Sequence, residues 1–309
     1  MNLPTLRQLR YLTAVVSLKH FGKAAEQCFV TQSTLSAGIQ DLEKLLGAKL
    51  LERTNRKVLV TSMGQEICQR AQQILLLSAD LVDVAQLEKN PLSGRIRIGV
   101  IPSISPFLLP KALPNVRRHL PQMELLLIEE QSDRLVKKLN EGEIDLAILA
   151  FPFDIGRLEH SIFASESFWV AMPNNHPLTK ATGVNASELP IDDLLLLTEG
   201  HCLRDHALTA CDLPATRHRT SMQGTSLYTL VEMVAGGLGI TLIPEMAINS
   251  EMVTHSDITL RPLVSQEKPT REIGLVWRSS YRATTSIDLL SEHFAAALNT
   301  HTIKREIID

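Results

Sequence analysis

The sequence predicts a mixed α/β protein with three parts: a small N-terminal winged helix-turn-helix, a long linker helix and a larger effector domain. Three observations support this fold class. The first 62 residues combine short amphipathic helical patterns with a charged hairpin pattern. Residues 63–90 carry a heptad seam. From Arg95 onward strand and helix patterns alternate, which is typical of an α/β domain.

The composition indicates a globular protein with one basic segment. The chain has 309 residues, of which 44% are hydrophobic, and a net charge of −3. Residues 1–60 hold nine Lys and Arg against four Asp and Glu, whereas the remainder is acidic, so we expect a polyanion partner for this segment only. No apolar run approaches the ~18 residues of a membrane span, and Arg7, Arg10 and Lys19 interrupt any signal-peptide pattern. We therefore expect a cytoplasmic protein with no membrane partner.

Three helices are expected near the N-terminus. Thr5 precedes an amphipathic pattern that continues to Val16, and residues 21–28 form a second, short helix. After a tight turn, Thr31 caps a third helix that Gly47 ends. Two short helices, a tight turn and a polar-fronted helix predict a helix-turn-helix.

The front of the third helix and the segment after it suit DNA. Small polar side chains at a helix N-terminus can contact base edges when that helix enters the major groove. The candidates for base contacts are Gln32, Ser33, Thr34 and Ser36. Residues 50–61 read as a hairpin with Asn55 at its turn, and Arg53 and Arg56 near its tip are candidates for phosphate contacts. The alternative is a solvated helix and a charged hairpin without a partner.

A long helix and a short hinge follow. The helix, expected over 63–90, repeats apolar or small residues by fours and threes: Ile67, Ala71, Ile74, Ser78, Leu81 and Ala85. So broad an apolar face needs a partner, either a second copy of the helix or its own domain. Pro and Gly make residues 91–94 the hinge.

The effector domain is expected to alternate strands and helices. The expected strands are 95–101, 123–129, 144–150, 168–172, 193–197, 217–222 and 240–243. The first expected helix has Ser105 as its N-cap. Ser132 and Ser226 are the expected N-caps of two later helices, 133–140 and 227–235. The other expected helices are 187–190, 201–210 and 283–298. This repetition predicts an open parallel sheet. Ser103, after a strand and before a helix, stands where such sheets bind ligands.

The residues around Cys202 favour a reactive thiol. Cys202 follows His201 and precedes Arg204 and Asp205. Neighbouring cations favour the reactive thiolate, and Arg204 is a fixed cation two residues away. Cys211, nine residues on, is a candidate resolving partner. Four cysteines are too few for a secreted disulfide scaffold, so a disulfide in this chain would be catalytic or sensory.

The expected helix sets a condition on any bridge between these cysteines. Nine residues of helix rise about 13.5 Å over two and a half turns. A disulfide needs Cα atoms within roughly 7 Å, so the helix would have to unwind and oxidation would act as a structural switch. Two other interpretations remain open. Both cysteines could be small buried apolar residues. A metal site could use His201, Cys202, His206 and Cys211, although their spacing matches no common zinc pattern. We read Cys28 and Cys68 as structural.

The motifs together resemble LysR-type transcriptional regulators. The resemblance lies in Ala24-Ala25, residues 31–36, Leu42-Glu43, Leu46-Gly47, residues 50–53 and residues 61–64. It implies that the linker helix pairs with its copy and that the effector domain has a two-lobed fold like that of periplasmic binding proteins. The implied segments are a DNA-binding domain at 1–62, a linker at 63–90, a hinge at 91–94, lobe I at 95–166 and 271–309, and lobe II at 167–270.

The effector domain is similar to the peroxide-sensing members of this family. The similarity lies in residues 200–205 with Cys211, Ile101-Pro102-Ser103, Thr225-Ser226-Leu227 and residues 239–242. It implies an activator in which hydrogen peroxide oxidises Cys202 to a sulfenic acid that condenses with Cys211. The implied peroxide pocket comprises Ser103, Ser132, His201, Arg204 and Asp205. No cofactor or metal is implied. The implied partners are double-stranded DNA, a second copy in a homodimer or homotetramer, RNA polymerase and a thiol reductant.

Two rival functions remain at this stage. The first is a LysR-type regulator that binds a small organic effector between its lobes and has inert cysteines. The second is an enzyme, a thiol peroxidase. The basic N-terminal motif argues against the enzyme, and we expect a regulator rather than a catalyst.

Overall fold

The computed structural model of the protein describes residues 3–53, 58–87, 94–211, 213, 223–264, 269–281 and 284–299. The chain divides into two compact units, Met1–Lys89 and Asn90–Asp309. Each unit has its own hydrophobic core.

The first unit contains the helix-turn-helix. Its helices are α1 (Leu6–Leu18), α2 (Phe21–Gln27) and α3 (Gln32–Leu46). Thr5 and Gln8 form a capping box at the start of α1, and the left-handed backbone of Gly47 ends α3. The core is fully buried at Leu12, Val15, Leu35, Ile39 and Leu42. The three predicted helices are confirmed.

A hairpin and a long helix complete this unit. Strands β1 (Leu51–Arg53) and β2 (Val58–Val60) pair antiparallel, which confirms the predicted hairpin. Helix α4 (Ser62–Leu87) follows and packs against α1. Its N-cap is Thr61, because the Thr61 hydroxyl accepts a hydrogen bond from the Gly64 amide at 2.9 Å. The far face of α4 leaves Ile74, Leu77 and Leu81 exposed.

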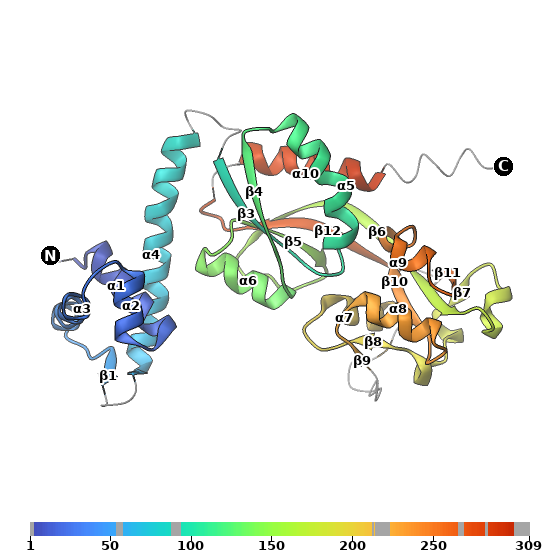
Figure 1. The fold of residues 1–309 in the computed structure, drawn as a ribbon, viewed down its shortest axis with the longest axis horizontal. Helices are drawn as coiled ribbons and strands as arrows, with labels where there is room; N and C mark the ends of the chain where they lie inside the picture. Colours follow the sequence, from blue (N-terminus) through green and yellow to red (C-terminus); the bar gives the residue numbers. More distant parts are fainter. Residues whose placement is uncertain are drawn as a thin grey trace. The chain divides into compact units, whose positions relative to one another are not determined.

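The second unit is organised around one mixed sheet (Figure 1). Its path is β4 (Met123–Glu129), β3 (Gly94–Val100), β5 (Leu146–Phe151), β12 (Thr270–Trp277), β6 (Glu159–Pro173), β11 (Ile258–Val264) and β7 (Val184–Asn185), with β10 (Thr241–Pro244) paired to β6. Strands β4, β3 and β5 are parallel. The expectation of a wholly parallel sheet is wrong, because β12 lies between β5 and β6 and is antiparallel to both.

Strand β6 changes its partners along its length. Up to Ser167, which faces Thr270, it pairs with β12. From Phe168 it pairs with β10 and β11. The change of partners falls between Ser167 and Phe168. With 15 residues, β6 is much longer than the strand expected over 168–172.

Helices cover both faces of the β3–β4–β5 region. Figure 1 shows α5 (Ser105–His119) and α10 (Thr284–Asn299) together on one side and α6 (Ser132–Glu141) on the other. Two predicted caps are off by one residue. Ser105 and Ser132 are the first helical residues, and the N-caps are Ile104 and Gln131, neither of which makes a side-chain cap hydrogen bond.

The remaining elements belong to predicted lobe II. They are η1 (Pro177–Lys180), η2 (Ala186–Glu188), η3 (Ile191–Asp193), β8 (Leu196–Leu197), α7 (Cys202–Ala210), β9 (Gln223–Gly224), α8 (Leu227–Ala235), η4 (Glu245–Ala247) and α9 (Glu251–Thr254). The expected strand over 193–197 shrinks to β8, and the one over 217–222 lies outside the described residues. Ser226 caps α8, as predicted, by accepting from the Thr229 amide at 3.1 Å. None of the helices within the described ranges combines the length and hydropathy that a membrane span needs.

Candidate functional site

The front of α3 presents an ordered group of hydroxyls. Oγ1 of Thr31 accepts from the Thr34 amide at 3.2 Å. It also lies 2.9 Å from Oγ of Ser33 and 2.8 Å from Oγ1 of Thr34. Gln32, Ser33 and Thr34 are exposed, whereas Ser36 is half-buried. Three of the four predicted base-contact residues therefore face solvent. Two of these three, Ser33 and Thr34, are held by the N-cap residue Thr31.

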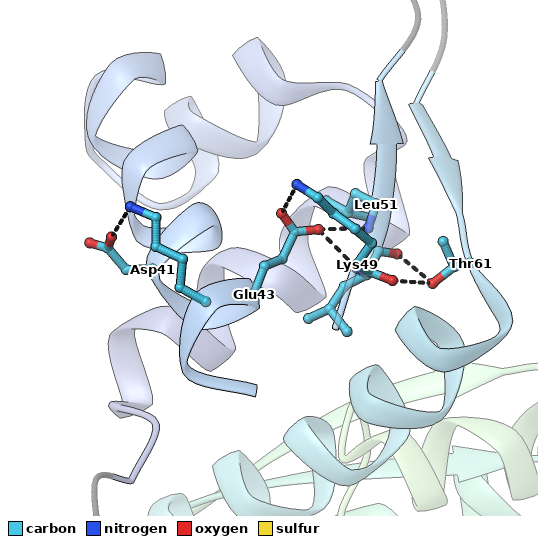
Figure 2. Close-up of polar contacts among 7 residues, drawn as sticks. Asp41, Glu43, Lys49, Leu51 and Thr61 are labelled. Carbon is cyan, nitrogen blue, oxygen red and sulfur yellow. Dashed lines mark hydrogen bonds and ion pairs between the residues drawn. The ribbon is translucent and has the colours of Figure 1, made fainter. Parts of the chain in front are cut away.

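A buried carboxylate attaches the hairpin to α3 (Figure 2). Oε1 of Glu43 accepts from the amides of Leu50 at 2.8 Å and Leu51 at 3.2 Å. Burial alone would raise the pKa of Glu43, but these two amides and the Lys49 ammonium outweigh it and lower the pKa. Oγ1 of Thr61 closes the base of the hairpin by donating to the Lys49 carbonyl at 2.8 Å. The start of the hairpin thus has a fixed position relative to α3.

Of the two predicted phosphate contacts, the structure describes the backbone of one. Arg53 is the last residue of β1, and Arg56 lies outside the described residues. The anchored strands keep the hairpin a candidate DNA-binding wing.

The second candidate site is the N-terminus of α7. His201 is the N-cap and Cys202 the first helical residue, which confirms the helix predicted over 201–210. Gly200 has a φ of +91°, and a Cβ there would lie 3.1 Å from Oε1 of Gln131. The glycine thus supplies a backbone conformation that L-residues rarely adopt and lets α7 begin close to the start of α6. Cys202 is buried, with 4% of its surface exposed.

A fully buried arginine forms the centre of this site. Nη1 of Arg271, on β12, donates to Oγ of Ser103 at 3.0 Å, and Nη2 donates to the Ser103 carbonyl at 3.1 Å. Nη2 also lies 2.7 Å from Oε1 of Glu166. The other carboxylate oxygen of Glu166 accepts from the Met246 amide at 2.7 Å. Both members of this buried ion pair are therefore hydrogen-bonded beyond the pair itself.

The balance of forces on Cys202 favours the protonated thiol. Burial raises the pKa of Cys202. The Arg271 guanidinium, the Ser132 hydroxyl and the Leu203 amide lower it by a smaller amount, while Asp205 adds to the rise. Oγ of Ser132 is buried and approaches the thiol without the geometry of a full hydrogen bond. Ser103 thus contacts Arg271 directly, and Arg271 and Ser132 both act on the Cys202 thiol.

The side chain of Arg204 is buried and reaches back to β8. The cation that lowers the pKa of Cys202 is Arg271. Nη1 of Arg204 instead points to the Leu197 carbonyl at 3.5 Å. The role of Arg204 as the main stabiliser of the thiolate stays a prediction. Asp205 is exposed and His201 is half-buried, with a pKa lowered by burial.

One turn after Cys202, His206 adds a polar group to the buried face of α7. Nε2 of His206 lies 2.9 Å from the carbonyl oxygen of Pro152, which can only accept, so this nitrogen carries the proton. Burial lowers the pKa of His206 to about 4. Nδ1 is buried and has no hydrogen-bond partner among the described residues. His206 is thus neutral and ties α7 to the segment after β5.

Cys211 is the C-cap of α7 and is buried. Burial raises its pKa to about 12. All four cysteines are described, and all are free thiols. The nine-residue separation between Cys202 and Cys211 corresponds to about 13.5 Å of rise along the helix axis. The metal interpretation of this stretch has no support, since the described residues contain no group of three or more His, Cys, Asp or Glu side chains that could hold a metal ion.

Arg271 and Glu166 had no signal in the sequence. Each sits in an ordinary strand pattern, and Arg271 lies 168 residues from Ser103. Only the pairing of β6 with β12, which sets Arg271 opposite Glu166, brings them together.

Comparison with known proteins defines the class. Residues 6–65 match the bacterial regulatory helix-turn-helix protein, lysR family, and residues 89–299 match the LysR substrate binding domain. The chain therefore belongs to the LysR family of DNA-binding transcriptional regulators. Its fold is an N-terminal winged helix-turn-helix followed by a regulatory domain like a periplasmic binding protein, which confirms the predicted fold class.

Within that family the chain is similar to OxyR. The DNA-binding transcriptional dual regulator OxyR of Escherichia coli is 36% identical over 296 residues, 96% of each chain. A full-length cysteine-to-aspartate variant of OxyR from Pseudomonas aeruginosa has a TM-score of 0.76 at 36% identity, covering 95% of this chain and 98% of that chain. A second relative, the HTH-type transcriptional regulator EstR of Acinetobacter baylyi, is 39% identical over 93% of this chain and 95% of that protein.

Proposed function

We propose that this regulator senses hydrogen peroxide through Cys202 and is switched by a disulfide between Cys202 and Cys211. The observation that carries the proposal is a buried free thiol at the N-terminus of α7, beside the fully buried Arg271 guanidinium. Support also comes from its relatives. Several are named hydrogen peroxide-inducible genes activators, and an OxyR variant of Corynebacterium glutamicum is solved with hydrogen peroxide bound.

The proposed reaction consumes one peroxide and two thiols. The Cys202 sulfur loses its proton and attacks one peroxide oxygen. An S–O bond forms, the O–O bond breaks, and the departing hydroxide takes up the thiol proton as water. The Cys211 sulfur then attacks the Cys202 sulfur. The S–S bond forms, the S–O bond of the sulfenic acid breaks, and the departing hydroxide takes up the Cys211 proton as a second water. Two electrons pass from the cysteines to the peroxide.

The buried polar groups have distinct roles in this reaction. Arg271 is held by Ser103 and Glu166, so its guanidinium is oriented before peroxide enters and can donate to the departing oxygen. Ser132 has a hydroxyl without a hydrogen-bond partner among the described residues, which suits it to hold the peroxide. The burial that keeps Cys202 protonated also protects it until peroxide is bound.

Disulfide formation changes the fold around α7. Closing the gap between the two Cα atoms to roughly 7 Å requires residues 203–210 to leave the helix. Leu203, Ala207 and Leu208 are buried and would lose their packing. Repacking of this surface could alter subunit contacts and the spacing of the DNA-binding domains. We place the regulator in the cytoplasm as a homodimer or homotetramer that acts with RNA polymerase and is reset by a thiol reductant.

The test compares reduced and peroxide-treated full-length protein. Peptide mapping by mass spectrometry should show a Cys202–Cys211 disulfide after treatment, and DNA footprints should change. Cys211→Ser should stop at the sulfenic acid, and Cys202→Ser should not respond. Cys28→Ser, a half-buried cysteine of the DNA-binding unit, serves as the matched control and should behave as the native chain. Unreacted thiols at Cys202 under excess peroxide would overturn the proposal.

A second candidate is a LysR-type regulator of a small organic effector with inert cysteines. The observation in its favour is the 39% identity to EstR, whose name refers to no peroxide. Thermal stabilisation by an organic metabolite, together with a footprint unchanged by peroxide, would favour this function. A thiol peroxidase, in contrast, would consume peroxide continuously in the presence of a reductant, and we propose that this chain does not.

A further inference from the structure

Phe29 occupies the turn of the helix-turn-helix with its ring in solvent. With 92% of its surface exposed, it is more exposed than any other large apolar side chain within the described ranges. Its backbone φ is +57°, in the left-handed region. The only other residue with positive φ that is not glycine, among those described, is Lys19 at the end of α1.

The backbone of this turn is one that normally selects glycine. The Phe29 amide donates to the Glu26 carbonyl, and the Val30 amide donates to the Ala25 carbonyl, both at 3.0 Å. These two bonds define a Schellman ending of α2 in which Phe29 holds the left-handed position. A bulky side chain is strained in this conformation. Backbone preference therefore does not account for phenylalanine at this position.

Packing within the chain does not account for it either. The neighbouring Val30 packs against the core of the DNA-binding unit, whereas the Phe29 ring buries almost none of its surface. The exposed ring gains no burial energy that would offset the backbone strain. A contact with a partner would account for the ring.

The position of the turn identifies that partner. Phe29 stands two residues before Thr31, the N-cap of α3, and the exposed Gln32, Ser33 and Thr34 follow directly. In a helix-turn-helix this end of the second helix enters the major groove. Residues 1–60 carry an excess of positive charge, which suits DNA.

We propose that Phe29 is a DNA-contact residue that packs against the apolar edge of one DNA strand at the mouth of the major groove. The apolar groups there are the C5 methyl of thymine and the deoxyribose carbons. The contact carries no charge, so it contributes to affinity without adding to the salt dependence that phosphate contacts create. This inference uses only the DNA-binding unit and is independent of the peroxide chemistry proposed above.

The test uses full-length reduced protein and a duplex selected by that protein from a random library. Phe29→Asn removes the ring and suits the left-handed backbone, so its thermal unfolding midpoint should equal or exceed that of the native chain. Its affinity for the selected duplex should fall roughly five- to twentyfold, the size of a lost base contact, with an unchanged slope of affinity against salt. Phe29→Tyr keeps the ring and should retain the affinity.

A duplex with uracil in place of thymine distinguishes the two apolar groups. If the native chain loses affinity for this duplex and Phe29→Asn does not, the ring packs on a thymine methyl. If both lose or keep affinity alike, while Phe29→Asn remains weaker than the native chain, the ring packs on deoxyribose. Affinity of Phe29→Asn equal to that of the native chain would overturn the proposal. So would a loss explained by weaker dimerisation, measured by sedimentation without DNA.

Discussion

Nη1 of Arg271 lies 3.0 Å from Oγ of Ser103, across 168 residues of sequence. The bond joins β12 to the segment that follows β3, and Glu166 holds the same guanidinium from β6. Because these partners fix Arg271, its charge acts on Cys202 from a defined direction and without reorganisation. This buried pair, rather than the residues next to Cys202 in sequence, is the basis of the proposed chemistry.

Arg271→Lys should slow the oxidation of Cys202 by peroxide roughly tenfold or more. Lysine keeps a charge, but it lacks the planar fork that serves Ser103 and Glu166 together. The matched control is Arg204→Lys, at a buried arginine of α7 whose donor points to Leu197, and it should change the rate little. Stopped-flow measurement of thiol loss gives both rates, and thermal unfolding checks the fold. Equal rates for the two variants would remove Arg271 from the reaction.

His206 should make the folded protein sensitive to mild acid. Burial lowers its pKa from 6.5 to about 4, so the unfolded chain binds this proton more tightly than the folded chain. The free energy of unfolding therefore has its full value above pH 6.5 and falls by roughly 3 kcal/mol as the pH falls from 6.5 to 4. His206→Gln keeps a donor for the Pro152 carbonyl and removes the titration. Urea unfolding at pH 7.5 and pH 5 should show less acid destabilisation in this variant, and equal destabilisation would contradict the assignment.

Arg53→Ala and Arg56→Ala should each weaken binding to all DNA sequences by a similar factor. A lost phosphate contact lowers the slope of log affinity against log salt by about one unit. Arg70→Ala is the matched control, because Arg70 is an exposed cation of α4 that pairs with Glu66 at 3.0 Å. Titrations by fluorescence anisotropy at several salt concentrations measure the slope. A slope that neither hairpin variant changes would exclude the wing as a phosphate contact.

The elements that periodicity could predict are those with one buried face. Helices α1, α3 and α7 repeat apolar residues toward a core, so their positions agree with the sequence to within a residue or two. The N-caps were harder to predict. Ser105 and Ser132 have side chains typical of N-caps, but in each helix the residue before the serine takes that position. The first half of β6 was missed because its residues are mostly exposed there and lack a clear apolar alternation.

The residues of the candidate site could be predicted only where they lie close together in the sequence. Cys202, Cys211 and His206 lie on one helix, so spacing and residue type could associate them. Arg271 lies in β12, and no local pattern separates a strand arginine in a buried network from one in solvent. Its role depends on the register of β12 against β6, a contact between residues more than 100 apart. Arg204 was singled out instead because proximity in sequence was the sole guide.

The central claim is tested most directly by hydrogen exchange across α7 in reduced and peroxide-treated protein. In the reduced protein the amides of residues 203–210 belong to a helix whose inner face is buried, and they should exchange slowly. After peroxide has formed the Cys202–Cys211 disulfide, these amides should exchange faster, while those of α3 should be unchanged. Cys211→Ser, which stops at the sulfenic acid, should retain slow exchange. Formation of the disulfide with residues 203–210 still as protected as in the reduced protein would contradict the account.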